Sequence, residues 1–384
     1  MKTVCDIGMC NGCMACVNSC QFNAIHVKKA INSYNAIIDG DLCVGCNKCS
    51  DVCPRNDTHL PLAHPKKWVE GWAKEREARA KSTSGGVAAA ILYAFIRNGG
   101  FVCSCSFVDG EFKYILTNEE KLIAGCIGSK YVKSDPNSIF KPLLAKLKKG
   151  YKVLFVGLPC HVAAIKSFID PCYHNRLYTI DLICHGTPSP TILEDFLNDK
   201  GVTLSEIENI SFRNKMSFRR EEYESIDKSG QIDCYSYLFL KKLIFTENCY
   251  SCQFATINRI SDLTLGDSWG TQLGKDEVSL GISLMLVQTS KGDELINIAN
   301  LITEKVDLGN AILKNSQLSS PVNLPAQRNQ AIEYINKGMK LEKIVYRLDR
   351  LFFWKLILKR LISKLIPNKV FFSTYGISVK IKHR

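Results

Sequence analysis

The sequence predicts an α/β body, with a mostly parallel sheet and flanking helices, preceded by a small α+β domain rich in cysteine. Two observations support this fold class. The first sixty residues contain an internal repeat of cysteines, and from residue 101 onward short apolar runs alternate with segments of helical periodicity. A chain of 384 residues is long enough for about two or three domains.

The cysteine repeat occupies residues 1–60. The run Cys10-x2-Cys13-x2-Cys16-x3-Cys20 recurs 33 positions later as Cys43-x2-Cys46-x2-Cys49-x3-Cys53, followed by Pro54. This is the spacing of bacterial two-cluster ferredoxins, in which the fourth cysteine of each run serves the other cluster. Zinc is the alternative for a Cys-x2-Cys pair, but it does not account for a third and fourth cysteine repeated at the same spacing. We therefore predict two 4Fe-4S clusters, one held by Cys10, Cys13, Cys16 and Cys53 and the other by Cys20, Cys43, Cys46 and Cys49.

The sequence also predicts the secondary structure of each domain. Two short strands are expected in the ferredoxin domain, at 24–27 and 35–39, and residues 61–81 are expected to form an irregular connector. In the body, at 82–155 and 156–310, strands are expected at 101–108, 112–116, 152–156 and 177–184, and helices at 138–149, 160–168 and 190–199. Ligands of such sheets bind beyond the carboxyl ends of the strands, where 157–161 and 184–186 lie.

Further cysteines and histidines lie at these strand ends. Cys160 and Cys184 each follow a predicted strand, and Cys249-x2-Cys252 is a tight chelating pair. These four residues form either a third 4Fe-4S site or a set of buried free thiols that pack as small hydrophobic groups. We expect His161 and His185 to be structural rather than proton relays or ligands. A spare thiol is expected at Cys5, and core thiols are expected at Cys103, Cys105, Cys126, Cys172 and Cys234.

Residues 82–86, with the sequence STSGG, precede an apolar helical segment. Free backbone N–H groups at such a helix start suit a phosphate, but ordinary helix capping by Ser82–Ser84 is the preferred interpretation of the pattern alone.

Several short segments together resemble the coenzyme F-420 hydrogenase/dehydrogenase beta-subunit family. They are 84–87 (SGGV), 128–132 (GSKYV), 157–160 (GLPC), 182–186 (LICHG), and 249–252 (CYSC) continuing to 262–270 (DLTLGDSWG). The likeness covers about residues 70–310, with the ferredoxin domain fused ahead of it.

The resemblance implies a flavoprotein with FAD and an iron–sulfur cluster beside it. It places Ser84, Gly85 and Gly86 at the FAD phosphates and Ser129, Lys130 and Tyr131 at the flavin. It also implies that Cys160, Cys184, Cys249 and Cys252 hold the third 4Fe-4S cluster. Asp267 and Trp269 belong to a family signature without an assigned role, and no catalytic residue is predicted.

The expected function is therefore that of an iron–sulfur flavoprotein oxidoreductase. Electrons pass between 4Fe-4S clusters and FAD, and a small or lipid-linked organic substrate is reduced or oxidised, with surface-polysaccharide synthesis as one setting. The alternative is a non-catalytic electron-transfer subunit that relays electrons to a partner enzyme, including deazaflavin (coenzyme F-420) dehydrogenase-type complexes. The redox donor is expected to be a ferredoxin or a reduced coenzyme. Arg213, Lys215, Arg219 and Arg220 offer charge for the acidic deazaflavin tail, but a solvated loop is the preferred interpretation.

The net charge of +13 is concentrated in the extension at 311–384, where residues 337–384 carry 13 Lys or Arg against Glu342 and Asp349. A basic tail on a nearly neutral body favours a docking surface over nucleic-acid binding. Residues 351–366 form an expected amphipathic helix, suited to an anionic membrane surface or to packing on this protein or a partner. Its apolar face would contain Leu351, Trp354, Ile357, Leu358, Leu361, Ile362 and Leu365, and its basic half Lys355, Lys359, Arg360 and Lys364.

The expected location is cytoplasmic, peripheral at the inner face of the membrane if the tail docks there. The first six residues lack the apolar region expected of a signal peptide, and no run reaches the roughly 20 apolar residues of a membrane span. In a reducing compartment, clustered thiols among the 18 cysteines bind metal more often than they form disulfides.

Overall fold

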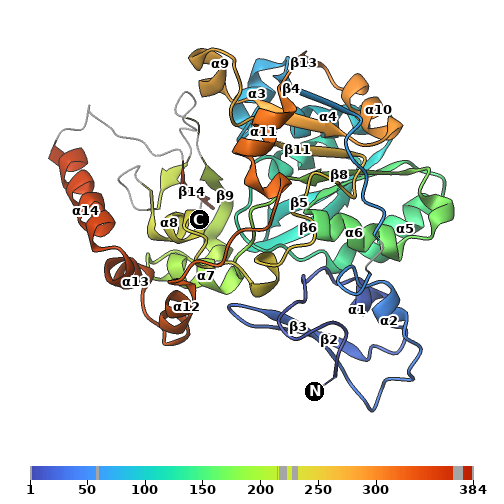
Figure 1. Cartoon of the computed structure of the whole chain (residues 1–384), viewed down its shortest axis with the longest axis horizontal. Helices are drawn as coiled ribbons and strands as arrows, with labels where there is room; N and C mark the ends of the chain where they lie inside the picture. The colour runs from blue at the N-terminus through green and yellow to red at the C-terminus, as the bar shows by residue number, and fades with distance from the viewer. Residues whose placement is uncertain are drawn as a thin grey trace.

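The computed structural model describes residues 2–57, 60–213, 215, 223–226, 232–365 and 375–382. The cysteine-rich domain lies below the larger α/β body in Figure 1, and helices α12 (Arg328–Asn336), α13 (Leu341–Leu348) and α14 (Arg350–Leu365) extend to the left. Short 3₁₀ turns occur between the main elements, at Glu120–Cys126, Asn137–Ile139, Pro171–Tyr173, Leu204–Glu206, Glu247–Cys249 and Ser316–Leu318.

The ferredoxin domain has a small antiparallel sheet in the order β1-β3-β2 and two short helices. Its elements are β1 (Lys2–Thr3), α1 (Ala15–Ser19), β2 (Ile25–Lys29), β3 (Tyr34–Ile38) and α2 (Lys48–Asp51). The cysteine repeat is also a backbone repeat. Gly12 and Gly45 have φ values of 70° and 72°, and the helix caps Met14 and Asn47 have 61° and 59°. A side chain at Gly12 would also meet the Tyr34 ring at 2.7 Å, so glycine is required there for both reasons.

The central sheet of the body contains eight strands in the order β13-β4-β12-β11-β8-β7-β5-β6. The four strands β11, β8, β7 and β5 are parallel, and the outer pairs on both sides are antiparallel. The α/β class is therefore confirmed, with the parallel strands at the centre. The bounds are β4 (Lys67–Ala73), β5 (Phe101–Val108), β6 (Glu111–Thr117), β7 (Val153–Gly157), β8 (Leu177–Leu182), β11 (Leu263–Asp267), β12 (Ser283–Val287) and β13 (Leu301–Glu304).

Helices cover both faces of this sheet because successive strand residues point to opposite sides. In β7, Leu154 and Val156 pack in the apolar cluster that contains α4 and α10, while Val153 and Phe155 pack with α5 and α6. The helices of the body are α3 (Arg76–Lys81), α4 (Val87–Arg97), α5 (Phe140–Lys148), α6 (Pro159–Phe168), α9 (Lys275–Leu280), α10 (Ser290–Ile298) and α11 (Leu308–Lys314).

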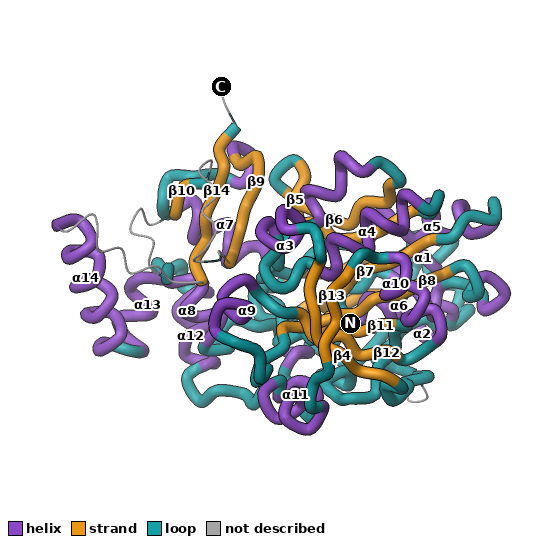
Figure 2. Tube along the Cα trace, turned by 90° about the horizontal axis from the view of Figure 1, so that it is seen from above, coloured by secondary structure: helices purple, strands orange, loops and turns teal. Residues whose placement is uncertain are grey.

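A second, smaller sheet joins the middle of the chain to its C-terminal part, in the order β10-β14-β9 (Figure 2). Its core unites Phe212 of β9 with Ile377 and Val379 of β14, under a group of helices. The elements are α7 (Pro190–Asn198), β9 (Ile207–Arg213), β10 (Glu224–Ser225), α8 (Cys234–Leu240), α12 (Arg328–Asn336), α13 (Leu341–Leu348), α14 (Arg350–Leu365) and β14 (Tyr375–Ile381).

Two expectations from the sequence are corrected by this architecture. The predicted connector at 61–81 contains β4, which lies inside the central sheet between β12 and β13. The predicted C-terminal extension contains β14, which pairs along the length of β9. In both cases the partner strands lie far away in the sequence, so the pairing is a tertiary effect.

Candidate iron–sulfur centres and cofactor cavity

The four cysteines predicted for the first cluster lie together inside the ferredoxin domain. Cys10, Cys13, Cys16 and Cys53 are all buried and line one small cavity. Cys53 belongs to the second run of the repeat, so the structure places the fourth cysteine with the other run, as the spacing predicts.

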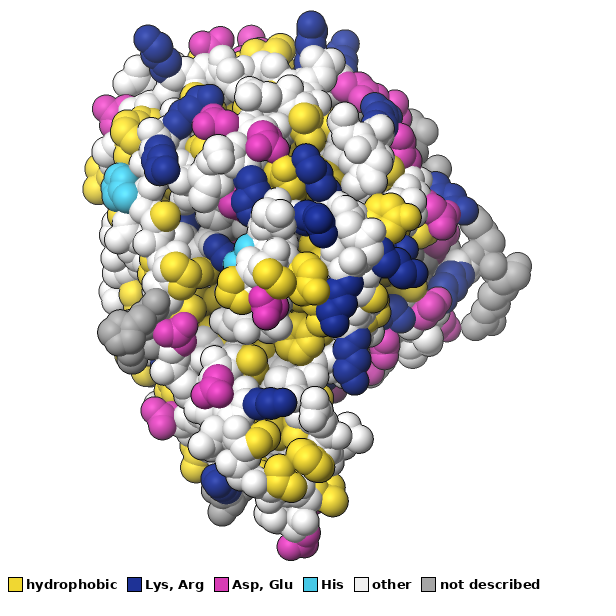
Figure 3. All heavy atoms as spheres, turned by 90° about the vertical axis from the view of Figure 1, so that its right-hand side faces the viewer, with side chains coloured by type: hydrophobic (Ala, Val, Ile, Leu, Met, Phe, Trp, Pro, Cys, Tyr) yellow, Lys and Arg dark blue, Asp and Glu magenta, His cyan; other side chains and the backbone are white. Residues whose placement is uncertain are grey.

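The second predicted set lines a separate cavity of about 170 Å³, formed by Cys20, Cys43, Cys46 and Cys49. This set is nearer to solvent, because Cys46 is exposed and the other three are half-buried. Exposed hydrophobic side chains surround it, namely Phe22, Leu42 and Val44. Figure 3 shows hydrophobic side chains gathered on the lower end of the molecule, where the ferredoxin domain lies.

Cys5, expected to be a spare thiol, lines the cavity of the first set. Hydrogen bonds from Cys5 lower the pKa of Cys10 to about 7 and that of Cys53 to about 7. Burial raises the pKa of Cys13 to about 12. Cys5 therefore favours the thiolate form of two predicted ligands, a role that its position outside the repeat did not indicate.

Within the described part of the chain, no three His, Cys, Asp or Glu side chains are grouped closely enough to hold a single metal ion.

The third cysteine group converges from three segments of the body. Cys160 lies in the first turn of α6, Cys184 follows β8, and Cys249 and Cys252 lie on the loop after Glu247. The charges of Cys160 and Cys184 each interact with Cys252, and Cys184 also interacts with Cys249. Burial raises the pKa of Cys184 to about 12 and also raises the pKa values of Cys160 and Cys252. A thiol gives up its proton when its sulfur binds a metal. The convergence of four such thiols therefore favours common ligands over separate core thiols.

A buried ion pair holds two of these segments together. Arg259 donates from Nη1 to the Phe254 carbonyl at 2.8 Å and from Nη2 to the Leu182 carbonyl at 2.9 Å. Its guanidinium also lies 3.2 Å from Oδ1 of Asp181 in β8. Because Phe254 is two residues after Cys252 and Leu182 two residues before Cys184, Arg259 fixes the spacing of the two cysteine segments.

The loop that carries Cys249 and Cys252 is also the contact with the ferredoxin domain. Gln253 donates to the Pro54 carbonyl at 2.5 Å, beside Cys53, and Asn248 donates to the Asn11 side chain at 3.1 Å, beside Cys10. Two further hydrogen bonds join the loop to the domain, from the Arg55 guanidinium to the Ser251 carbonyl at 3.0 Å and from the Glu247 amide to the Asn32 carbonyl at 2.8 Å. The charges of Cys13 and Cys160 interact across this boundary. The three cysteine groups thus form a continuous series from the surface of the ferredoxin domain into the body.

A cavity of about 440 Å³ opens at the carboxyl ends of β7, β8 and β11, next to the third cysteine group. Cys184 belongs to the third cysteine group and also lines this cavity. The lining includes the start of α4, the 126–132 loop and the 182–187 segment. Five of the six predicted cofactor residues line this cavity, namely Ser84, Gly86, Ser129, Lys130 and Tyr131.

Gly85 is the exception and corrects the prediction. Its amide donates to Oγ of Ser283 at 3.0 Å, and a side chain there would lie 2.5 Å from the Gly71 carbonyl oxygen. Gly85 therefore lets the start of α4 approach β4 and β12, and its N–H group is already used within the protein. Lys130 also has internal partners, since its ammonium donates to the carbonyls of Ile127 and Gly128 at 3.1 Å.

Aromatic rings form one side of the cavity. Tyr131 stacks on Phe239, with ring centroids 4.4 Å apart and planes 18° apart, and lies 6.3 Å from Tyr375 in a parallel orientation. Asp267 and Trp269, which had no assigned role, also line the cavity. Arg213 pairs with Asp267 at 2.5 Å and stacks over Trp269.

Two family comparisons match the same regions that the geometry singles out. Residues 150–307 match the C terminus of the family described as "Coenzyme F420 hydrogenase/dehydrogenase, beta subunit", and residues 9–56 match "4Fe-4S dicluster domain". The chain therefore contains a C-terminal domain of the coenzyme F420 hydrogenase/dehydrogenase beta-subunit type, preceded by a 4Fe-4S dicluster domain.

Among solved structures, a chain of the F420-reducing [NiFe] hydrogenase complex from Methanosarcina barkeri matches with a TM-score of 0.46 and 16% sequence identity. The match covers 67% of this chain and 91% of that chain. No curated protein matches the chain. The two family matches identify a beta-subunit relative with an iron–sulfur, electron-transferring, oxidoreductase character. They do not extend to FAD, a third cluster, a lipid-linked substrate or surface-polysaccharide synthesis.

A solvated charged loop is expected at 213–220. The two charged residues described there, Arg213 and Lys215, form internal contacts instead. Arg213 forms the ion pair described above. The Lys215 ammonium donates to the carbonyls of Arg79, Ser84 and Leu280, each at 2.6 Å. Arg219 and Arg220 lie outside the described residues. Arg213 and Lys215 thus stabilise the protein's own structure.

The histidines and cysteines expected to be structural lie in different surroundings. His161 is buried, its Nδ1 lies 2.9 Å from the Tyr114 hydroxyl, and burial lowers its pKa to about 3, so it is a neutral core residue. His185, by contrast, is exposed and lines the cavity. Cys103 and Cys234 are buried as expected. Cys105 and Cys126 line the cavity, and Cys172 is exposed, which corrects its assignment to the core.

Tyr375 is one of the cavity residues that the sequence does not predict. The alternation of Tyr375, Ile377, Val379 and Ile381 is a strand signal, but nothing in it indicates that the strand returns to a distant site.

Proposed function

We propose that the chain is an electron-transfer subunit that conducts electrons from a redox partner, through three 4Fe-4S clusters, to a flavin. The outer cluster is held by Cys20, Cys43, Cys46 and Cys49, the next by Cys10, Cys13, Cys16 and Cys53, and the third by Cys160, Cys184, Cys249 and Cys252. The supporting observation is the loop at 247–253, which carries two of the third ligand set and contacts the ferredoxin domain beside Cys10 and Cys53.

The direction of electron transfer along the three clusters is inferred from the solvent exposure of their ligand sets. Cys46 and its apolar neighbours Phe22, Leu42 and Val44 are accessible to a partner, whereas the first set is buried and the third lies against the cavity. An exposed apolar patch rimmed by polar residues is typical of a protein–protein contact. A ferredoxin-like donor or a partner enzyme subunit fits this patch.

The residues present fit clusters and a flavin. The two ferredoxin sets each offer four thiols around one cavity, and the third set converges from three segments beside the larger cavity. That cavity combines apolar and aromatic walls with the hydroxyls of Ser84, before α4, and Ser129, in the 126–132 loop. A flavin supplies the exchange between single-electron and two-electron chemistry. Tyr131 would bind its apolar ring, and the first turn of α4, beginning after Gly86, would orient its phosphates.

Anaerobic purification of the full chain tests the proposal. We expect a brown protein with iron and sulfide, 4Fe-4S signals in the EPR spectrum after reduction with dithionite, and bleaching of a bound flavin. Protein that contains zinc or no metal would contradict the electron-transfer role. Protein with clusters but without flavin would contradict only the assignment of the cavity.

Filling the cavity separates the flavin from the clusters. Ala88 lies on the first turn of α4 and lines the cavity, so Ala88→Phe is expected to reduce the bound flavin at least tenfold by occupying its space, while iron content stays at the wild-type level. Flavin released by denaturation is measured by fluorescence. Ala90→Phe is the matched control on the same helix, outside the cavity lining. Equal flavin content in the two variants would show that the flavin binds elsewhere.

Catalysis by the chain itself is the second candidate function. It is supported by three titratable side chains on the cavity wall, His185, Lys242 and Asp267, because reduction of an organic substrate requires protons as well as electrons. The substrate is then a deazaflavin coenzyme or a small or lipid-linked organic molecule. Turnover by the isolated chain with a reduced donor distinguishes an enzyme from a relay subunit.

We also propose that α14 docks on an anionic membrane surface. No described helix has the length and hydropathy to cross a membrane. Leu351, Trp354, Leu358 and Leu361 are each more than half exposed and form one stripe, with Lys355 and Lys359 exposed beside it. Leu356 is buried and Phe352 stacks on Tyr237 on the packed side.

Three expected members of the two faces differ in the structure. Ile357 and Ile362 are half-buried, and Arg360 pairs with Glu342. The side chains of Lys364 and Leu365 lie outside the described residues.

Leu358→Glu tests the membrane proposal by placing a negative charge in the stripe. We expect binding to vesicles that contain anionic lipid to fall at least tenfold in a sedimentation assay, since a charge is costly at an apolar membrane contact. Leu313→Glu, at an exposed leucine of α11, is the control and should bind as wild type. Equal binding by both variants, or no binding by the wild type, would contradict the proposal.

A further inference from the structure

Lys133 is a buried lysine at the boundary between the ferredoxin domain and the body. It follows the 126–132 loop that lines the flavin cavity, and only 4% of its surface is exposed. Its ammonium donates to the Asn11 carbonyl at 3.2 Å and lies 5.3 Å from the centre of the Tyr34 ring. Both contacts are with the ferredoxin domain, and Asn11 directly follows Cys10.

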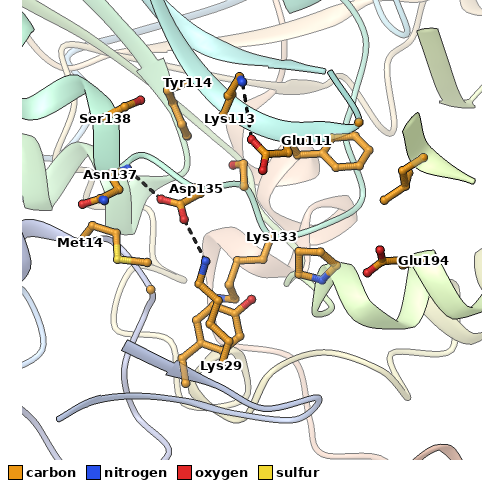
Figure 4. A pocket seen from close by; sticks show the side chains of 17 residues that line it. Met14, Lys29, Glu111, Lys113, Tyr114, Lys133, Asp135, Asn137, Ser138 and Glu194 are labelled. Carbon is orange, nitrogen blue, oxygen red and sulfur yellow. Dashed lines mark hydrogen bonds and ion pairs between the residues drawn. The ribbon is translucent and has the colours of Figure 1, made fainter. Parts of the chain in front are cut away.

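The charge of Lys133 has no carboxylate partner among the residues that the structure describes. Asp135 lies nearby but pairs with Lys29 at 2.9 Å (Figure 4). Lys29 and Asp135 line, together with Lys133, a cavity of about 660 Å³ between the domains. In the same cavity Lys113 pairs with Glu111. A buried charge without a counter-charge is strongly unfavourable, so the position of Lys133 requires negative charge from another source.

Cysteines from two different ligand sets surround Lys133. The groups whose charges interact with it are Cys249 and Cys160 of the third set and Cys10 of the first, together with Tyr34. Burial lowers the pKa of Lys133, and the thiolates more than offset this effect, so its pKa is raised and it stays an ammonium. No cysteine of the outer set is among these neighbours. Lys133 is therefore a fixed positive charge placed between two of the three proposed clusters and away from the outer one.

We propose that Lys133 raises the reduction potentials of the clusters held by the Cys10 set and the Cys160 set, and thereby favours the transfer of electrons from the outer cluster into this pair. This inference rests on the proposed function. In the step concerned, one electron would leave the cluster of the outer set, which is oxidised, and enter the cluster of the first set, which is reduced. No proton moves. Reduction adds negative charge to a cluster, and a nearby cation stabilises that charge in a site of low dielectric constant.

Lys133→Met tests the proposal, since methionine keeps the apolar stem and removes the charge. We expect both potentials to fall in an EPR-monitored redox titration. The ratio of reduced to oxidised cluster at a fixed applied potential should decrease about tenfold, which corresponds to about 59 mV for one electron. The cluster of the outer set should keep its potential, because none of its cysteines is among the main groups whose charges act on Lys133.

Three further variants make the test decisive. Lys133→Arg keeps the charge and should keep both potentials near those of the wild type. Lys133→Gln removes the charge but retains a donor for the Asn11 carbonyl, so it serves if Lys133→Met assembles poorly. Lys166→Met is the matched control, because Lys166 is a partly buried lysine that donates to the Ile260 carbonyl at 2.8 Å and has no cysteine among its charged neighbours. It should change none of the three potentials.

Unchanged potentials in iron-loaded Lys133→Met or Lys133→Gln protein would overturn the inference and leave the proposed function intact. Loss of iron from both neutral variants, with full iron in Lys133→Arg, would also overturn it, because Lys133 would then act in cluster assembly. Absence of clusters from the wild type is a different result, since it removes the proposed function itself.

Discussion

Cys252→Ser is expected to remove the third cluster and leave the ferredoxin domain loaded. About a third of the iron should be lost, because one of the three proposed 4Fe-4S sites loses a ligand. The ferredoxin ligands lie on other segments and should be unaffected. Flavin reduction by a donor that enters at the Cys46 end should stop, since electrons would no longer reach the cavity beyond Cys184. Iron analysis, EPR of the reduced protein and stopped-flow absorbance of the flavin measure these effects.

Cys172→Ser is the matched control for this substitution. Cys172 is exposed and lies in a turn between α6 and β8. It should keep full iron and normal flavin reduction. If Cys252→Ser also keeps both, the four body cysteines are not cluster ligands. If it loses iron but the flavin is still reduced at the wild-type rate, electrons reach the cavity by another route.

The ferredoxin sites could be predicted from the sequence because their geometry is local. Three ligands of each set lie within seven consecutive residues, and the positive φ values of Gly12 and Gly45 repeat along with the cysteines. Only the fourth ligand of each set is non-local, because Cys20 joins the second run and Cys53 joins the first. This assignment follows from the approximate symmetry of the two halves. Cys5 was missed because it stands outside the repeat and approaches Cys10 and Cys53 only through folding.

The alternation of strands and helices from β5 to α7 was also predictable, since each element has its own apolar period. β4 was not, because Lys67 and Glu70 interrupt its apolar pattern and its partner β12 lies more than 200 residues away. Glu70 is buried only because Ser268 and Thr271 donate hydrogen bonds to it. A charged residue therefore belongs to the sheet interior through partners that the local sequence does not show.

The cavity residues illustrate the same limit at single positions. Ser84 and Gly86 line the cavity while Gly85 between them packs against β4 and β12, because successive residues at the start of α4 face different neighbours. Lys215, placed by its sequence in a charged stretch, is surrounded by three carbonyl groups of other segments. Residue type predicted the kind of site, and tertiary contacts decided which members take part.

Arg259→Met is expected to have the largest effect on stability. Asp181 is fully buried and Arg259 is 2% exposed. Removing the guanidinium leaves a buried carboxylate without a counter-charge, which should lower the free energy of unfolding by about 3–5 kcal/mol. Thermal or denaturant unfolding of the metal-loaded protein measures the loss. The iron of the third site should fall as well, because Arg259 joins Phe254, near Cys252, to Leu182, near Cys184.

The double variant Arg259→Met with Asp181→Asn separates charge from position. Neutralising Asp181 should recover part of the stability, with a coupling of about 0.5–3 kcal/mol, because the unpaired charge is gone. It should not recover the iron, since neither new side chain donates to the Phe254 and Leu182 carbonyls. Lys67→Met, which breaks an exposed ion pair with Asp293, should change stability by only about 0–1 kcal/mol. Full iron in the double variant would mean that the ion pair contributes stability alone and that the cysteine segments are positioned by the rest of the fold.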